Sequence, residues 1–234
     1  MRIPARSALL SLAWLALLSL PRPAAGAPDA PHQSPPVQAF SFDREHAALL
    51  VMDFENDILA MLPEKAQGPL LDRASAILKE ARAARLPIIY VVVRFRDGYP
   101  ELSPQNKRFS ALKASGRLRE GSPGAEIHGR VAPQAGDFVV TKRRVGAFST
   151  TDLESILRAN HITTLAMIGI STSGVVLSTV RWASDLDYQL LVVGDACADF
   201  DDEVHRVLME KVFPGQATVL TTEAFLQALE AKAK

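Results

Sequence analysis

The 234-residue sequence has one cysteine, few aromatic residues and no net charge, and these shortages exclude several classes of protein. Because Cys197 is the only cysteine, no internal disulfide can stabilise the fold. Lys and Arg number 26 against 26 Asp and Glu, so no excess of positive charge is present to attract nucleic acid or an anionic membrane. The composition favours a small-molecule partner and predicts no nucleic-acid binding.

Long apolar runs are also scarce, and the N-terminal one is short. Arg2 and Arg6 precede Ala8–Leu20, an apolar run of 13 residues, and the small residues Ala24–Gly26 follow. A membrane-spanning helix needs about 20 apolar residues. Residues 1–26 therefore predict an export signal, cleaved near Gly26, that directs the protein to the periplasm or the exterior without stable membrane insertion. Retention of the segment as an N-terminal anchor is the alternative.

A proline-rich linker, residues 27–38, separates the signal from a single predicted domain, residues 39–234. Cleavage at residue 26 removes three arginines and no acid, which leaves the mature chain with a net charge of −3. The remaining length is sufficient for one domain with a full hydrophobic core.

Within the domain, short apolar runs alternate with longer segments of helical periodicity. This alternation predicts βαβ units, and hence a parallel sheet with helices on both faces. The expected strands are Ala47–Asp53, Pro87–Val93, Phe138–Lys142, Thr164–Gly169, Gln189–Gly194 and Thr218–Thr221. The expected helices are Pro69–Arg85, Asp152–Asn160, Val175–Leu186, Glu203–Phe213 and Glu223–Lys232. The connection Arg94–Gly136 is much longer than the others, which is typical of a lid or binding loop.

Polar residues follow several of these strands, at the edge of the sheet where open α/β folds bind ligands. Asp53 ends the first strand, and it is equally compatible with a catalytic acid and with a cap for the next segment. Lys142 ends the third strand and begins a run of three cations, Lys142–Arg144, which more often forms a solvated turn than a site. The fourth strand leads into the turn Ser171–Gly174, which offers hydroxyls and backbone amides but no thiol.

In order and spacing, several motifs between Ala47 and Leu226 resemble those of the isochorismatase-like (cysteine hydrolase) family. The motifs are Asp53, Pro123–His128, Gly136–Arg144, Ala147–Phe148, Thr151–Leu153, Gly169–Thr172, Thr179 and Ala183. The resemblance implies a three-layer α/β/α sandwich with a six-stranded parallel sheet, in agreement with the strand count. It also implies a small-molecule substrate and frequent oligomers in the family, although no feature of this sequence fixes a stoichiometry.

The family's catalytic triad is Asp, Lys and Cys, and the resemblance assigns the acid to Asp53 and the lysine to Lys142. The nucleophile position is Val175, which has no lone pair, so covalent catalysis by a thiolate is not expected. Cys197 lies after the next strand and is expected to be a buried, inert side chain. The chain is thus similar to a member of the family that lacks the catalytic cysteine.

Family members that hydrolyse the enol ether of isochorismate also lack the thiol, and their aspartate is thought to protonate the vinyl carbon. Transferred here, Asp53 is the general acid, Lys142 positions it or the substrate's carboxylate, and water captures the oxocarbenium ion. These two roles conflict. A general acid needs a raised pKa, whereas the nearby Lys142 ammonium group lowers the pKa of Asp53. Two alternatives remain: hydrolysis of an amide by water that Asp53 activates, and a catalytically silent binding protein.

The resemblance further implies an oxyanion site at Ser173, Gly174 and Val175, with a cis peptide expected at Ser173–Gly174. The turn hydroxyls of Ser171, Thr172, Ser173 and Ser178 have no evident histidine partner in the sequence, so we expect them to serve in turns and caps.

The sequence predicts no metal and no cofactor. Zinc-dependent relatives carry an Asp/His cluster after the second strand, and residues 94–100 contain no histidine here. Arg94, Arg96 and Tyr99 in that segment are expected either to bind a substrate carboxylate or to remain solvated.

Overall fold

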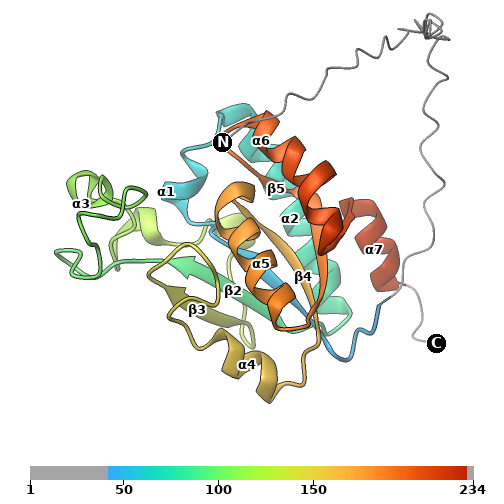
Figure 1. Cartoon of the computed structure of the whole chain (residues 1–234). Coiled ribbons are helices and arrows are strands. Elements are labelled where there is room, and N and C mark those ends of the chain that lie inside the picture. The colour runs from blue at the N-terminus through green and yellow to red at the C-terminus, as the bar shows by residue number, and fades with distance from the viewer. Residues whose placement is uncertain (1–41, 231–234) are drawn as a thin grey trace, which may run out of the picture. The chain divides into compact units, whose positions relative to one another are not determined.

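The computed structural model describes residues 42–230, which form a six-stranded sheet with helices on both faces (Figure 1). All the strands are parallel and lie in the order β3-β2-β1-β4-β5-β6. Their bounds are β1 Ala47–Met52, β2 Ile88–Val93, β3 Phe138–Lys142, β4 Thr164–Ile170, β5 Gln189–Ala198 and β6 Thr218–Leu220. The predicted signal, 1–26, and linker, 27–38, lie outside the described residues.

Every strand predicted from the sequence is present, and the fold class is confirmed. The predicted and observed ends agree within one residue, except that β5 continues to Ala198. In β1, β2 and β4 every residue is buried, because helices cover both faces of the central strands. This explains why these strands read as continuous apolar runs rather than alternating ones.

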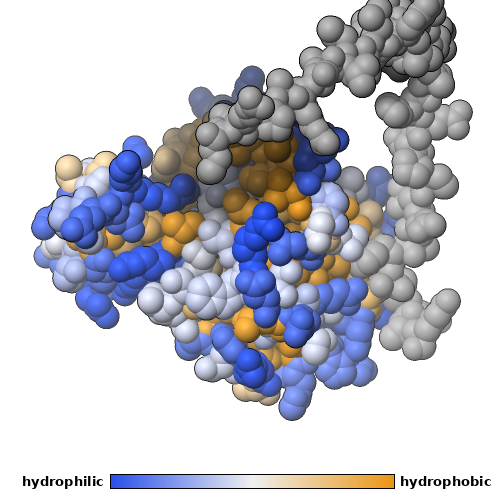
Figure 2. All heavy atoms as spheres, in the orientation of Figure 1, coloured by the Kyte–Doolittle hydropathy of each residue, from blue (hydrophilic) through white to orange (hydrophobic). Residues whose placement is uncertain are grey.

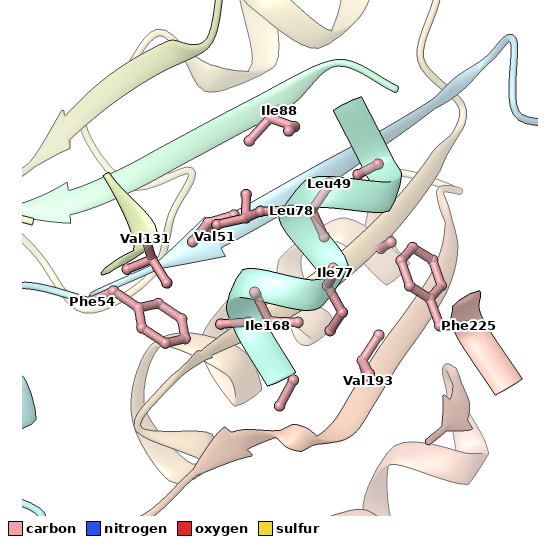
Figure 3. Packing of buried hydrophobic residues seen from close by; sticks show 14 of the residues in the cluster. Leu49, Val51, Phe54, Ile77, Leu78, Ile88, Val131, Ile168, Val193 and Phe225 are labelled. Carbon is pink, nitrogen blue, oxygen red and sulfur yellow. The ribbon is translucent and has the colours of Figure 1, made fainter. Parts of the chain in front are cut away.

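The helices divide between the two faces of the sheet. The longer ones are α2 Glu64–Ala83, α4 Leu153–Ala159, α5 Leu177–Asp185, α6 Asp202–Val207 and α7 Thr222–Glu230. Side chains of α2 and α7 pack on one face with alternate strand residues; in Figure 3, Leu78 of α2 lies near Leu49 and Val51 of β1, and Ile77 lies between Ile168 and Val193. The other face packs against α4, α5 and the π-helical continuation of α6, Leu208–Val212.

Two helices begin more than one residue away from the predicted start. The predicted start is Pro69, a residue type that favours the first turn of a helix, but α2 begins at Glu64 and contains Pro69. The helix predicted from Val175 is preceded by a π-helical turn, Thr172–Val176, and α5 itself begins at Leu177. This turn carries the chain from β4 into α5 at the edge of the sheet.

The long connection between β2 and β3 has a small hydrophobic cluster of its own. Phe95, Tyr99, Phe109 and Leu118 pack together with Val93 at the end of β2. The connection includes the short helix α3, Leu112–Ser115, and single 3-10 turns at Pro123–Ala125 and Gly129–Val131. In Figure 2 its outer side chains are mainly hydrophilic, with hydrophobic ones between them. Another short helix, α1 Asn56–Leu59, follows β1.

Between residues 42 and 230, no helix has both the length and the hydropathy needed to cross a bilayer.

Replacing Phe225 tests the core between α7 and the sheet. Phe225 is fully buried, so Phe225→Ala should lower the free energy of unfolding by about 3–5 kcal/mol, because it removes a large apolar side chain and leaves a cavity. Phe138→Ala on the edge strand β3 is the matched control, since Phe138 is 38% exposed. Denaturant unfolding measures both; equal losses would contradict this description of the core.

Candidate active site

The candidate site is a cavity of about 270 Å³ at the edge of the sheet where β1, β2, β3 and β4 end. Its size suits a small molecule. The polar residues of its wall are Asp53, Asp57, Arg108, Arg117, Lys142 and Ser171. The rest is apolar: Ile58, Met61, Val93, Phe109, Leu112, Leu118, Val145, Ile170, Val175 and Phe200.

Asp53 and Lys142 form a buried ion pair in this wall. Lys142 Nζ lies 2.9 Å from Asp53 Oδ2 and also donates a hydrogen bond to the Arg144 carbonyl oxygen at 3.2 Å. The two side chains are 8% and 1% exposed for Asp53 and Lys142 respectively. Because β2 lies between β1 and β3, the pair links strands that are not neighbours. The sequence prediction named both residues, and the structure brings them into contact.

The two oxygens of the Asp53 carboxyl group differ, because Oδ2 accepts a hydrogen bond from Lys142 and Oδ1 accepts none from the described residues. Asp53 adopts a left-handed backbone conformation, with φ of 61°, directly after β1. Among the described residues its Oδ1 atom has no hydrogen-bond partner. Burial raises the pKa of Asp53 above its ordinary value, while the charges of Lys142 and Arg108 oppose the increase. Burial therefore outweighs the ammonium group, which is the balance that a general acid at this position requires.

The turn after β4 differs from its prediction in two respects. The cis peptide lies at Ile170–Ser171, so the expectation of one at Ser173–Gly174 was wrong. Residues 173 and 174 lie within the π-helical turn, where trans peptides continue the helical path. In addition, the Ser173 N–H donates to Asp199 Oδ2 at 2.5 Å and the Gly174 N–H donates to the Ser171 carbonyl oxygen at 3.1 Å. Two of the three residues predicted to form the oxyanion site, Ser173 and Gly174, thus have amides with partners within the protein.

The cavity wall contains no thiol. Val175, the residue at the nucleophile position, is 1% exposed and forms part of the wall. Cys197 lies on β5 among core residues and outside the cavity lining. Burial raises the pKa of the Cys197 thiol to about 12, so the thiol stays protonated and is a poor nucleophile.

A histidine partner for one turn hydroxyl, which the sequence did not reveal, is present in the structure. His205 Nδ1 of α6 lies 2.8 Å from Thr172 Oγ1. Burial lowers the pKa of His205, with Asp199 and Asp202 opposing, so the neutral imidazole is favoured. Thr172 is fully buried and outside the cavity lining, so the contact fastens the turn to α6 and does not prepare a nucleophile.

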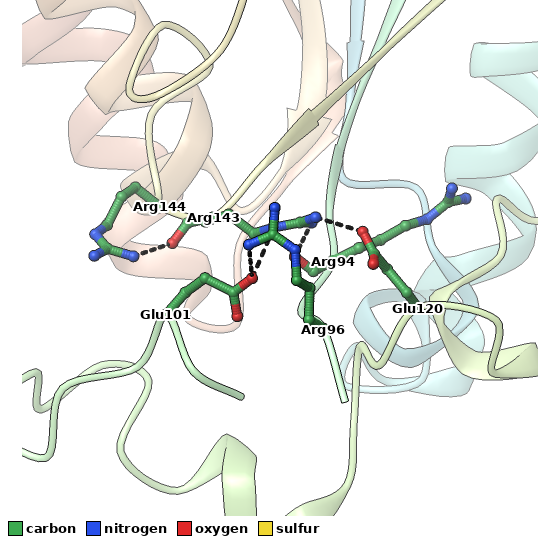
Figure 4. Close-up of polar contacts among 6 residues, drawn as sticks. All are labelled: Arg94, Arg96, Glu101, Glu120, Arg143 and Arg144. Carbon is green, nitrogen blue, oxygen red and sulfur yellow. Dashed lines mark hydrogen bonds and ion pairs between the residues drawn. The ribbon is translucent and has the colours of Figure 1, made fainter. Parts of the chain in front are cut away.

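Arg94 and Arg96, at the start of the long connection, bind other residues of the protein and do not line the cavity. Arg143 binds the Arg94 carbonyl oxygen, Glu101 and Glu120, and Arg96 binds Glu101 (Figure 4). This network fastens the connection to the end of β3. Arg94 itself donates to the Ala125 carbonyl oxygen at 2.9 Å, so Arg94 and Arg96 are both engaged away from the cavity.

Two other arginines from the same connection reach the cavity. Arg108 and Arg117 lie in its wall, and Arg108 Nη2 approaches Ser171 Oγ at 3.5 Å. Tyr99, which was expected either to bind a substrate carboxylate or to remain solvated, donates to the Arg117 carbonyl oxygen at 2.8 Å. No local pattern in the sequence distinguishes Arg108 from its exposed neighbour Lys107. Their roles depend on how the connection between β2 and β3 folds over the turn that follows β4.

Glu55 is a further buried acid that the sequence prediction did not select. It is fully buried, and its Oε1 atom accepts a 2.5 Å hydrogen bond from the Val93 N–H. The available signal was its position, two residues after Asp53 and directly after the apolar residue Phe54.

In residues 42–230, no three His, Cys, Asp or Glu side chains are grouped so that they could hold a metal ion.

Comparisons with known proteins find a family and several relatives that this chain resembles. The family model "Isochorismatase domain" matches residues 47–224. The isochorismatase family protein YwoC of Bacillus subtilis is 34% identical over 194 residues, which cover 83% of this chain and 100% of that protein. A probable isochorismatase of Pseudomonas chlororaphis is 32% identical, covering 79% of this chain and 86% of its own.

An amide-cleaving relative and a solved structure are also similar to the chain. The ureidoacrylate amidohydrolase RutB of Klebsiella pneumoniae is 31% identical, covering 68% of this chain and 76% of its own. The crystal structure of a cysteine hydrolase from Pseudomonas syringae pv. phaseolicola superposes with a TM-score of 0.74 at 22% identity, covering 85% of this chain and 99% of that one. At that identity the structure supports the fold alone.

A double-mutant cycle tests the energetic coupling of the buried pair. Lys142→Met should lower the free energy of unfolding by about 3–5 kcal/mol, because it leaves Asp53 buried without its cation. The loss should be greater at pH 8 than at pH 5, since Asp53 can escape the cost at low pH by taking up a proton. Denaturant unfolding should show that Asp53→Asn with Lys142→Met costs less than the two single changes added together.

The exposed pair Arg158 and Glu154 on α4 provides the control for that cycle. Arg158→Met should change the free energy of unfolding by no more than about 0.5 kcal/mol. Strict additivity of Asp53→Asn and Lys142→Met would mean that the buried pair is not coupled.

Proposed function

The chain belongs to the isochorismatase family, and we propose that it is a hydrolase of small anionic molecules in which Asp53 transfers the proton and no thiol takes part. The observation that carries the proposal is the buried Asp53–Lys142 pair in the wall of a cavity without a thiol. The family assignment supports hydrolysis in general; the substrate and the mechanism are proposed here from the site.

The first candidate reaction is hydrolysis of an enol ether such as that of isochorismate. Protonated Asp53 gives its proton to the vinyl carbon, and the ether carbon becomes an oxocarbenium ion. Water adds to this carbon and returns a proton to the Asp53 carboxylate, which gives a hemiketal. The bond to the ether oxygen then breaks while the hemiketal hydroxyl proton passes to that oxygen, and pyruvate and an alcohol are released. Each proton that leaves Asp53 is replaced by one from water, so the step is balanced and needs no covalent enzyme intermediate. The raised pKa of Asp53, caused by burial, favours this role.

The charges in the cavity wall favour an anionic substrate. Arg108, Arg117 and Lys142 face two acids, Asp53 and Asp57. Asp57 is already committed, because its Oδ2 atom accepts a hydrogen bond from the Leu118 N–H at 2.8 Å. A substrate carboxylate near Arg108 would therefore meet positive charge, while the apolar part of the wall accommodates the rest of the molecule.

Hydrolysis of a C–N bond is the second candidate, because a relative is named as an amidohydrolase. Without a thiolate, Asp53 would have to act as a base on water. A silent binding protein is the remaining candidate, favoured by Val175 at the nucleophile position. The arrangement of Asp53 beside Lys142 supports catalysis over binding alone, since a ligand-binding protein has no need for a carboxyl group with a raised pKa.

We propose in addition, from the N-terminal signal, that the protein acts after export. Isochorismate is normally a cytoplasmic metabolite, so an exported enzyme would act on a different molecule with the same bond type or charge.

Turnover of isochorismate and of a panel of small amides separates the three candidates. We expect pyruvate release from isochorismate or a related enol ether, and we expect Asp53→Asn to lower kcat by about 100-fold or more, since the proton donor is lost. Asp185→Asn on α5, outside the cavity lining, is the control and should retain activity. Cleavage of amides alone would replace the enol-ether mechanism, and no turnover by folded protein would support the binding protein.

Arg108→Gln tests the choice of an anionic substrate. Loss of a charge-assisted hydrogen bond of about 1.5–3 kcal/mol should raise KM for a carboxylate substrate by about tenfold or more, with a smaller effect on its uncharged ester. Lys107→Gln, next in the chain but outside the cavity lining, should leave KM unchanged. Equal effects of the two variants would argue against a specific role for Arg108.

A further inference from the structure

Glu55 is a fully buried carboxyl group behind the wall of the site. It lies two residues after Asp53 and does not line the cavity. The Val93 N–H donates to its Oε1 atom at 2.5 Å, and no described residue bonds its Oε2 atom. A buried polar oxygen without a partner is rare and costly, and it is more costly on a charged group than on a neutral one.

The balance of charge around Glu55 is uneven. The charged groups that act on it are Asp53 and Lys142, and the single Lys142 ammonium already donates to Asp53 Oδ2. One cation cannot balance two buried carboxylates, so full ionisation would leave an uncompensated negative charge in the interior. A proton on one of the two carboxyl groups removes that charge. The Lys142 contact favours ionisation of Asp53, which leaves Glu55 as the group that keeps the proton.

We infer that Glu55 is a positioning residue that holds a proton beside the Asp53–Lys142 pair, so that the resting site contains one carboxylate and one carboxylic acid. Burial, followed by the negative charge of Asp53, raises the pKa of Glu55 well above its ordinary value, in agreement with this assignment.

The proton held by Glu55 can protonate Asp53 even though the neighbouring Lys142 ammonium group favours the ionised form of Asp53. Transfer of the proton from Glu55 to Asp53 produces a protonated Asp53 without taking up a proton from solvent. After Asp53 protonates the substrate, the proton lost by the attacking water returns to the two carboxyl groups, and their original protonation is restored. This role in turnover rests on the proposed function; the protonation of Glu55 at rest does not.

Glu55→Gln tests the protonation state without any need for a substrate. Glutamine keeps an oxygen for the Val93 N–H and is neutral, so it mimics the protonated acid. The unfolded wild type releases the Glu55 proton near its ordinary pKa, whereas the folded protein retains it, so this group's contribution to stability falls as the pH rises above that value. We expect the melting temperatures of the wild type and Glu55→Gln to converge near pH 4.5 and the variant to become the more stable protein toward pH 8.

The opposite trend would overturn the inference. If Glu55→Gln fails to fold, or loses stability relative to the wild type as the pH rises, then Glu55 is ionised and pairs with Lys142. A difference that does not change with pH would equally contradict a proton held by Glu55. Repeating the comparison in Asp53→Asn is a second check: the difference between Glu and Gln should shrink, because the negative charge that favours a proton on Glu55 is absent.

Turnover supplies the separate test of the catalytic part. Glu55→Gln should lower kcat about tenfold or more and shift the pH profile of kcat, with little change in KM, because Glu55 does not line the cavity. An unchanged kcat profile together with the expected melting behaviour would confine Glu55 to a structural role. Absence of turnover in the wild type would overturn the proposed function, while the melting experiment would still decide the state of Glu55.

Discussion

The site depends on the need to neutralise an ammonium group placed inside the protein. Lys142 is almost fully buried at the end of β3, and it reaches across the end of β2 to Asp53. Without that carboxylate, the cost of desolvating the lysine would be uncompensated. The same contact fixes the orientation of Asp53, whose second oxygen has no hydrogen-bond partner among residues 42–230. The one ion pair therefore both neutralises the buried Lys142 and orients the Asp53 carboxyl group in the cavity wall.

The absence of a thiol changes how such a site can work. Val175 occupies the cavity wall at the nucleophile position, and the one cysteine lies in the core with a pKa too high for it to react. Catalysis by a thiolate is consequently not available at this site, whereas carboxyl groups can move protons when burial changes their affinity for them. The buried acids Asp53 and Glu55 and the cation Lys142 are suited to that task, and Arg108 and Arg117 of the long connection add positive charge to the cavity wall.

The long connection contributes to the site because it is anchored at both ends. Its own aromatic cluster packs against the end of β2, and Arg143 joins it to the end of β3 through Glu101 and Glu120. Arg143 belongs to the run of three cations that the sequence pattern assigned to a solvated turn. In the structure the three residues have separate roles, since Lys142 enters the site, Arg143 holds the connection and the Arg144 carbonyl oxygen accepts a hydrogen bond from Lys142.

The sequence by itself determined the strands and the fold class, because buried parallel strands require uninterrupted apolar runs and these are local properties of the chain. It also indicated Asp53 and Lys142, since both end such runs and match a family pattern. Tertiary structure alone decided which side chains meet: Arg108 rather than Arg94 or Arg96 at the cavity, His205 beside Thr172, and Glu55 behind Asp53. Contacts of this kind join residues far apart in sequence or depend on the path of a loop, and the polarity of a single residue does not show whether it will face a partner or solvent.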